Sequence, residues 1–261
     1  MRIIFVRHGE PDYTRDSLTE KGWREAHFLS QRISKWKVTQ FYCSPLGRAR
    51  DTASCTLEKM NRTAVTLDWM KEFAYDIEDP LNGRRGIPWD FVSSCWSSDA
   101  LMLDPEGWPE SDIMRTNPQI ATDYRMVCQN FDNLLASYGY VRENHFYRMP
   151  GAKERFIPHT YSPSRPDALD ELPDSLEEPV IVIFCHLGIT CLVLSHLLNI
   201  AFPLLVHGFF LPTSSITVLS SEERWSNEAY FRVQTIGDVN HLLVNNEPIS
   251  SAGSFTRAFQ G

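Results

Sequence analysis

Four residues that can bind or attack an anion each follow a short apolar segment, directly or after one turn. They are Arg7, His8, Arg48 and His186. Ligands of an open α/β sheet bind outside the carboxyl ends of its strands. We therefore expect these residues to meet at one edge, although they lie far apart in the sequence. Helices that begin near Gly47 and Gly188 would add backbone N–H groups that point the same way.

This set of residues suits phosphoryl transfer. An arginine offers a planar, permanently charged fork that matches phosphate oxygens. Two arginines and a protonated histidine would stabilise the charge on the transferring group. The other histidine must be neutral at one ring nitrogen to act as a nucleophile, and an ordinary pKa of about 6.5 permits this near neutral pH. Each residue alone is more often solvated or capping, so the inference rests on the joint pattern.

The expected secondary structure places these residues in an α/β fold. Strands are expected at residues 2–6, 40–43, 64–67, 140–149, 180–184, 214–220 and 229–236. Helices are expected at about 20–33, capped by Thr19 or Ser17, and at 47–60, 118–138 and 188–199. The alternation predicts a three-layer α/β/α architecture with a mostly parallel central sheet.

The length of 261 residues predicts one domain, and its middle carries an insertion. Residues 76–116 have no clean period but hold three of the seven tryptophans, which is typical of an inserted cap and not of a linker. We expect these tryptophans to form a small core within the cap. Residues 150–179 contain six prolines and are expected to be a functional lid or disordered. The prediction is a single domain over 1–261, with 76–178 as an inserted cap and lid region.

Charge and composition exclude several classes of protein. Acidic residues outnumber basic ones by 33 to 25, a net charge of −8, which argues against a nucleic-acid or anionic-membrane binder. A few arginines in a cleft can still bind an anionic small molecule. The six cysteines form no C-x-x-C pair and no zinc-like spacing, so we expect buried thiols in a reducing cytoplasm.

One segment has the apolar density of a membrane span. Residues 180–198 are mostly apolar and close to the length that crosses a bilayer. The β-branched start, the turn-permitting Gly188 and the polar His186 favour a buried strand that runs into a packed helix. The apolar run after Met1 and Arg2 is too short for a signal peptide, so we expect a cytoplasmic protein.

The motifs around these residues resemble those of the histidine phosphatase superfamily, which contains the cofactor-dependent phosphoglycerate mutases and many phosphatases. The matching segments are Arg7-His8-Gly9-Glu10, Leu18-Thr19-Glu20-Lys21-Gly22, Ser44-Pro45-Leu46-Gly47-Arg48-Ala49, Thr52-Ala53, Glu72 and His186. Their order and spacing both fit. The resemblance covers roughly residues 1–75 and 180–240, and it implies the fold and chemistry of the phosphatase branch.

By this resemblance, His8 would be the nucleophile that takes the phosphoryl group as a phosphohistidine. Arg7, Arg48, His186 and the backbone N–H of Leu187 would hold the phosphate. A small residue is frequent in the family where this chain has Leu187, so its side chain must narrow the pocket or turn into the core. No metal and no other cofactor is implied, because the arginines take the role of a metal.

The resemblance also implies that Glu72 is the acid that protonates the leaving oxygen and then helps water attack. A carboxyl group among cations needs a tuned pKa for this role. The neighbouring carboxylates Asp76, Glu78 and Asp79 could serve instead. Weaker candidates for substrate contacts are Glu10, Tyr13, Arg84 and Arg85. Cys185 precedes His186 but alternates to the other side of the strand, which argues against a catalytic thiol.

The sequence therefore predicts a phosphomonoesterase that hydrolyses a small phosphorylated metabolite. The main competing hypothesis is a mutase, which must hold a bisphosphorylated intermediate and should need more basic residues than the nearly neutral segment 11–16 offers. A protein phosphatase and a non-catalytic phospho-ligand-binding protein are also compatible with these residues. An exposed strand edge or the aromatic cap could pair two subunits, which leaves a homodimer open.

Overall fold

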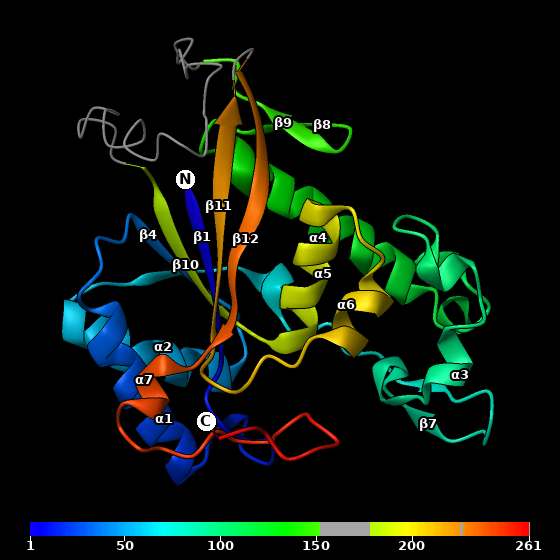
Figure 1. Ribbon diagram of the computed structural model, residues 1–261, viewed down its shortest axis with the longest axis horizontal. Helices are drawn as coiled ribbons and strands as arrows, with labels where there is room; N and C mark the ends of the chain where they lie inside the picture. The colour runs from blue at the N-terminus through cyan, green and yellow to red at the C-terminus, as the bar shows by residue number, and fades with distance from the viewer. Residues whose placement is uncertain (152–177, 225–226, 261) are drawn as a thin grey trace, which may run out of the picture.

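A mixed eight-stranded sheet forms the centre of the computed structural model, which describes residues 1–151, 178–224 and 227–260 (Figure 1). The strand order is β5-β4-β10-β1-β11-β12-β9-β8. Their bounds are β1 Arg2–Arg7, β4 Gln40–Cys43, β5 Ala64–Thr66, β8 Val141–Glu143, β9 Phe146–Arg148, β10 Val180–Cys185, β11 Ile216–Arg224 and β12 Glu228–Asp238. The short pairs β2 Pro11–Asp12 with β3 Ser17–Leu18, and β6 Ile77–Glu78 with β7 Arg85–Gly86, lie outside this sheet.

The α/β class is confirmed, but the sheet is parallel in only one half. β5, β4, β10 and β1 run parallel, whereas each of the pairs from β1 to β8 is antiparallel. The prediction of a mostly parallel sheet was therefore wrong. The expected strand at 140–149 is the hairpin β8–β9, and β11 and β12 are joined by a connection far too short for a parallel crossover.

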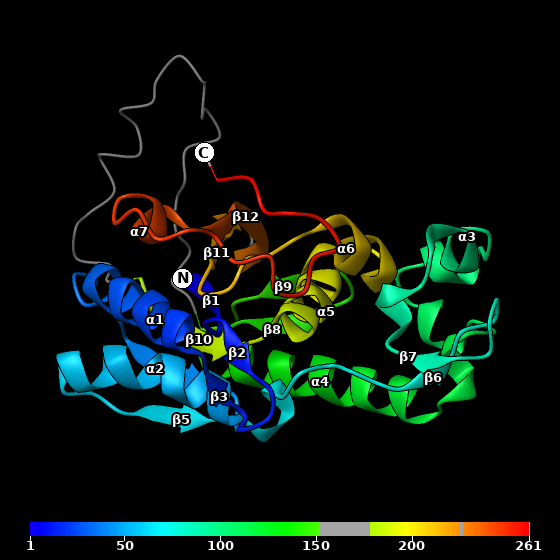
Figure 2. The same cartoon turned by 90° about the horizontal axis from the view of Figure 1, so that it is seen from below.

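Helices cover both faces of the sheet (Figure 2). Successive residues of a strand point to opposite faces, and in the central strands the residues on either face are apolar and buried. The helices are α1 Glu20–Ile33, α2 Gly47–Met60, α3 Ser93–Trp96, α4 Gln119–Ala136, α5 Leu187–Leu198, α6 Phe202–Gly208 and α7 Asn240–Leu243. The face toward α4 and α5 carries Ile3, Phe5, Ile181 and Ile183. The face toward α1 and α2 carries Ile4, Val6, Val182 and Phe184. The central strands are thus buried between two hydrophobic clusters, which fixes the edge at which Arg7, His8 and His186 lie.

The helix ends follow local sequence rules. Thr19, one of the two expected caps, closes the start of α1 by accepting a hydrogen bond from the Gly22 N–H at 3.0 Å. α2 ends on Asn61, whose left-handed backbone (φ 52°) terminates the helix. The apolar window 180–198 is strand β10 followed by the twelve-residue helix α5. Within the described ranges, no helix has the length and apolarity needed to cross a membrane.

The described part of the predicted cap, residues 76–151, consists of short elements that lead into the long helix α4. Its tryptophans do not form a separate core. Trp108 is fully buried and packs with Tyr124 of α4, and with Phe73 and Phe202 outside the segment. Trp89 packs on the same two phenylalanines. This region is therefore continuous with the core beside α5 and α6. The predicted lid lies almost entirely outside the described residues.

Candidate active site

The parallel register of β1 and β10 brings two histidines together. Arg7 pairs with Cys185 in the last position of both strands, so His8 and His186 follow at the same edge. The His8 N–H donates to the Cys185 carbonyl at 3.0 Å, and the two imidazole centroids lie 5.1 Å apart. Both rings are almost completely buried. The convergence expected from the sequence is thus observed for these histidines.

His8 is held in one tautomer. Its Nδ1 lies 2.7 Å from the Gly9 carbonyl oxygen, and because a carbonyl can only accept, Nδ1 must carry the proton. Nε2 is left as an unprotonated atom with a free lone pair. Burial lowers the pKa of His8 well below its ordinary value, and Arg7 and Arg48 lower it further, against a smaller opposing effect of the Gly9 carbonyl. His8 is therefore neutral, as a nucleophile must be.

Gly9 permits the tight turn after the nucleophile. A side chain at Gly9 would place Cβ 2.7 Å from the Gly22 carbonyl oxygen of α1, and the Gly9 N–H donates to Thr52 Oγ1 at 2.9 Å. The matched motifs of α1 and α2 thus pack directly on the turn that carries His8. This explains why a glycine and a small hydroxyl residue stand at these positions.

His186 is held by a residue that sequence reasoning missed. Ser44 Oγ lies 2.7 Å from His186 Nε2, and both side chains are fully buried. The hydroxyl also accepts weakly from the Leu46 N–H at 3.3 Å, so its own proton is free to donate to Nε2. That arrangement puts the ring proton of His186 on Nδ1, which is buried and has no hydrogen-bond partner among the described residues. An anion could accept from it.

Burial of His186 opposes the protonation that the sequence reasoning expects when a phosphoryl group is bound. Burial lowers its pKa well below the ordinary value, and His8, Arg48 and Arg7 lower it further. The lowered pKa favours the neutral ring, which offers a single N–H donor. A phosphate dianion beside it would favour the charged form, so protonation would accompany binding.

Arg7 is a buried cation held by neutral oxygens. Its side chain is only 5% exposed, and Nη1 and Nη2 donate to the carbonyls of Leu211 and Ala252 at 2.5 and 3.0 Å. Nε is buried without a partner among the described residues. Burial lowers the pKa of Arg7 and the nearby Glu72 carboxylate opposes this shift. Most of the guanidinium charge is left for an incoming anion.

Arg48 stands at the start of α2, against a carboxylate. Its Nη1 donates to Asp16 Oδ1 at 2.6 Å, and Asp16 Oδ2 accepts from the Gly47 N–H at 2.6 Å. Partial burial acts to raise the pKa of Asp16, but the hydrogen bonds from Gly47 and Arg48 outweigh it and lower the pKa. The exposed ring of Tyr13 lies 5.5 Å from the Arg48 guanidinium carbon. Asp16 thus partly neutralises the second arginine.

The Glu72 carboxylate lies at the start of α5, the helix that directly follows His186. Its Oε1 accepts from the N–H groups of Phe73 at 2.9 Å and Ile189 at 3.0 Å. Gly188 allows this approach, because a Cβ there would lie 2.7 Å from Oε1. The carboxylate is fixed through one oxygen, whereas no hydrogen bond to Oε2 is seen from residues 1–151, 178–224 or 227–260. Two of the neighbouring carboxylates have other partners: Asp76 pairs with Arg85 at 2.9 Å, and Asp79 accepts hydrogen bonds within the β6–β7 turn. The third, Glu78, is exposed in β6.

The weaker candidates have mostly structural contacts. Glu10 accepts from Thr19 Oγ1 at 3.0 Å and from Ser250 Oγ at 2.6 Å. Arg84 and Arg85 are exposed in the β6–β7 hairpin, where Asp76 engages the Arg85 fork. The Leu187 side chain is partly buried and packs against the core, the second of the two expected alternatives, and Leu187 is the first residue of α5.

Four of the six cysteines are buried, as expected, whereas Cys55 and Cys128 are only partly buried. All six are free. Burial raises the pKa of Cys185 to about 12, and its Sγ lies 3.3 Å from Thr190 Oγ1 inside α5. A neutral thiol is a poor nucleophile, which agrees with the argument against catalysis by this residue.

Part of the sequence matches a known family. Residues 3–83 match the model of the histidine phosphatase superfamily (branch 1). A 2,3-bisphosphoglycerate-dependent phosphoglycerate mutase of Thermoplasma acidophilum is 34% identical over 73 residues, 24% of this chain and 36% of that protein. A probable phosphoglycerate mutase GpmB of Yersinia pestis is 33% identical over 81 residues, 28% of this chain and 38% of that protein. Each match thus spans little more than a third of the relative.

The structural similarity extends over nearly the whole chain. A phosphoserine phosphatase variant of Entamoeba histolytica superposes with a TM-score of 0.56 at 17% identity, covering 92% of this chain and 98% of that one. A mycobacterial glucosyl-3-phosphoglycerate phosphatase gives a TM-score of 0.55 at 18% identity, covering 90% and 98%. At such identity the likeness shows the fold. The predicted resemblance is confirmed: residues 3–83 match the histidine phosphatase superfamily in sequence, and the chain has the fold of these solved phosphatases.

Proposed function

We propose that this protein is a phosphomonoesterase that works through a phosphohistidine on His8. One observation carries the proposal: the Gly9 carbonyl fixes the proton on Nδ1, while burial and two arginines keep the ring neutral. His8 Nε2 is thus an unprotonated nucleophile close to the charges of Arg7 and Arg48. A solvated or capping histidine would need neither the fixed tautomer nor the lowered pKa.

The reaction has two steps. His8 Nε2 attacks phosphorus and the bond to the ester oxygen breaks, while Glu72 Oε2 supplies the proton that the leaving alcohol takes. The ionised carboxylate then accepts a proton from water as its oxygen attacks phosphorus, and the bond to nitrogen breaks. Arg7, Arg48 and the Nδ1–H of His186 bind the equatorial oxygens throughout. The products are the alcohol and inorganic phosphate, and His8 is regenerated.

Charge favours hydrolysis over phosphoryl transfer by a mutase. Arg7 and Arg48 are the two arginines of the site, and Asp16 already engages Arg48 at 2.6 Å while Glu72 lies nearby. Asp16 therefore offsets one of the two positive charges before the site binds a single phosphate. A mutase must hold a bisphosphorylated intermediate with several more negative charges. The relatives matched in sequence are mutases and the structural neighbours are phosphatases, so the comparisons leave both chemistries in play.

Burial favours a small substrate over a protein. His8 is 2% exposed and His186 is fully buried, so the phosphoryl group must enter deeply between the surrounding elements. A small phosphorylated metabolite fits such a site better than a phosphorylated side chain on a folded protein.

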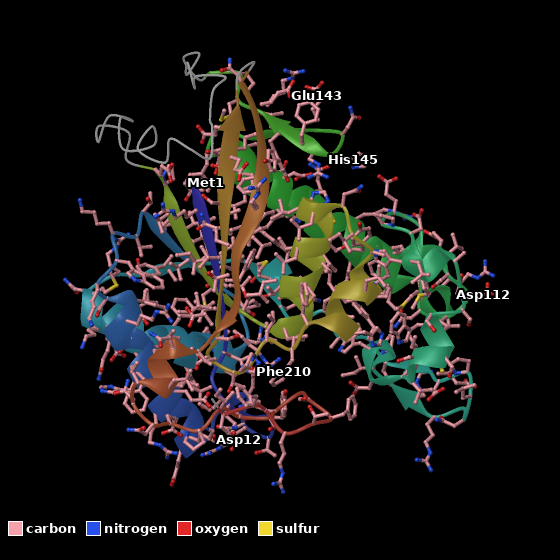
Figure 3. All side chains as sticks on the ribbon, viewed as in Figure 1. Met1, Asp12, Asp112, Glu143, His145 and Phe210 are labelled. Atoms are coloured by element: carbon pink, nitrogen blue, oxygen red, sulfur yellow. The ribbon has the colours of Figure 1, made fainter. Side chains whose placement is uncertain are left out.

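The test is hydrolysis of p-nitrophenyl phosphate without added metal, with a rapid quench to trap the intermediate. We expect an acid-labile, base-stable phosphoenzyme in the wild type and its loss in His8→Ala. His145→Ala is the matched control, because His145 lies at the far end of the sheet from Asp12 and Phe210, which mark the end of β1 (Figure 3). Phosphate binding without any phosphoenzyme would instead favour a non-catalytic binding protein. Transfer from a bisphosphate primer would favour the mutase.

A further inference from the structure

The C-terminal segment of the chain is folded onto the candidate active site. Residues 249–260 form a closed loop, because the Gln260 side chain bonds to both backbone groups of Ile249 at 2.8 and 3.1 Å. Inside the loop, Ser251 Oγ accepts from the Ala258 N–H at 2.9 Å. This C-terminal loop passes the carboxyl end of β1 (Figures 1 and 2). It lies outside the part of the sequence that matches the family model.

The loop is anchored to the first motif by charged and polar contacts. Glu247, just before it, pairs with Lys21 and Arg24 of α1, each at 3.0 Å. Within it, Ser250 Oγ donates to Glu10 Oε2 at 2.6 Å and accepts from the Ala252 N–H at 3.2 Å. The Ala252 carbonyl then accepts from Arg7 Nη2 at 3.0 Å. A chain of contacts thus leads from α1 to the guanidinium of Arg7.

Gly253 makes this approach possible. Its φ of +82° favours glycine, and a Cβ built on it would lie 2.9 Å from Arg7 Nη2 and 3.7 Å from both Cζ and Nη1. Arg7 is 5% exposed, so its guanidinium has little room to move aside. The loop therefore sets where the fork of Arg7 lies, and it does so with a neutral carbonyl that leaves the cationic charge available.

We propose that the C-terminal loop is a positioning element of the phosphate site, in which the Ala252 carbonyl aims the Arg7 guanidinium and Gly253 admits it. The proposal rests on the proposed function only in that Arg7 binds the phosphate. Arg7 remains the group that would touch the ligand, and Gly253 acts through it.

The test measures inorganic phosphate binding to the full chain by calorimetry. Gly253→Ala should weaken binding about tenfold, the loss expected when one charge-assisted hydrogen bond is misplaced. Gly139→Ala is the matched control, because Gly139 has a similar φ of +92° and no atom within 4 Å of a built Cβ. It carries the same backbone strain without the contact to Arg7, and phosphate affinity should be unchanged.

A double-mutant cycle then asks whether Gly253 acts through Arg7. In an Arg7→Ala background, Gly253→Ala should change the phosphate affinity less than twofold. Equal weakening in both backgrounds, or equal effects of Gly253→Ala and Gly139→Ala, would overturn the proposal. If Gly253→Ala does not fold, Gln260→Ala opens the loop without touching Arg7, and it should weaken binding only while Arg7 is present.

The two proposals fail separately. If the double-mutant cycle is non-additive but no phosphohistidine is trapped, the loop is a positioning element of a phosphate-binding site and the proposed hydrolase activity is refuted. A trapped phosphohistidine with an additive cycle would keep the hydrolase and remove the positioning role of the loop.

Discussion

Replacement of Ser44 by alanine removes the hydrogen bond to His186 and the weak one from the Leu46 N–H, and leaves every proposed reacting group in place. The Ser44 hydroxyl is the partner of His186 Nε2 at 2.7 Å, and both side chains are fully buried. In the variant no hydroxyl selects the tautomer that places the proton on Nδ1. The ring can then adopt either tautomer. One presents a lone pair that repels the phosphate, and the other presents the N–H group that binds it.

The size of the effect follows from burial. A buried polar atom that loses its partner costs about 1–3 kcal/mol. If about 2 kcal/mol is lost in the phosphate-bound transition state, kcat/KM falls about 30-fold, since 1.36 kcal/mol is tenfold. The free energy of unfolding should fall by about 1–2 kcal/mol, because the same atom is unpartnered in the folded protein.

The assay is steady-state hydrolysis of p-nitrophenyl phosphate, with urea denaturation of the same samples. Ser54→Ala is the control: its hydroxyl bonds to the Asp51 carbonyl within α2 at 2.8 Å, and both quantities should stay near the wild-type values. An unchanged kcat/KM together with a lower unfolding free energy would refute the reasoning. Ser44 would then support the fold alone.

Three further predictions concern titratable groups. Glu72→Gln keeps an oxygen that can accept from the two backbone N–H groups, so the fold should persist. We expect kcat to fall about 10²–10⁴-fold, and to fall more for alkyl esters than for p-nitrophenyl esters, whose leaving group needs no proton. Steady-state kinetics with a series of substrates check this. Burial and two arginines lower the pKa of His8, so the acidic limb of the pH profile of kcat/KM should lie below pH 6.5. Arg48→Gln removes one of these charges and should move the limb to higher pH. A limb that does not move would contradict this. Burial also lowers the pKa of His241 to about 4. Between pH 6.5 and about 4 this proton binds mainly to the unfolded state, so the free energy of unfolding decreases as the pH falls. Between pH 7 and pH 5, His241→Asn should lose about 2 kcal/mol less of this free energy than the wild type. Urea denaturation at the two pH values measures the difference.

The parallel half of the sheet could be predicted because its signals are local. β1, β4 and β10 are short apolar runs, β4 and β10 lead into helices, and the lengths of β4, α2 and β10 were expected within one or two residues. The antiparallel half was assigned wrongly although a signal was present. Only a few residues separate β11 from β12, which allows a hairpin and no crossover.

The reacting residues could be found from the sequence, whereas their supports could not. Arg7, His8 and His186 stand at strand ends and carry distinctive chemistry. Ser44 and Ala252 contact them from distant parts of the chain, and nothing in a serine or an alanine marks that role. The Ala252 contact is made by a backbone carbonyl, which any residue could supply, and the one sequence signal beside it is the glycine that follows.

The strand order has a consequence for the route by which this chain folds. β1 pairs with β10 and β11, so Arg2 finds its partners Val180 and Ser220 after more than two thirds of the chain has been made. β4 and β5 emerge earlier, yet β10 separates them from β1. Such long-range pairing implies a high contact order and slow folding. During synthesis the apolar first strand would stay unpaired until β10 emerges, and only then could His8 and His186 come together.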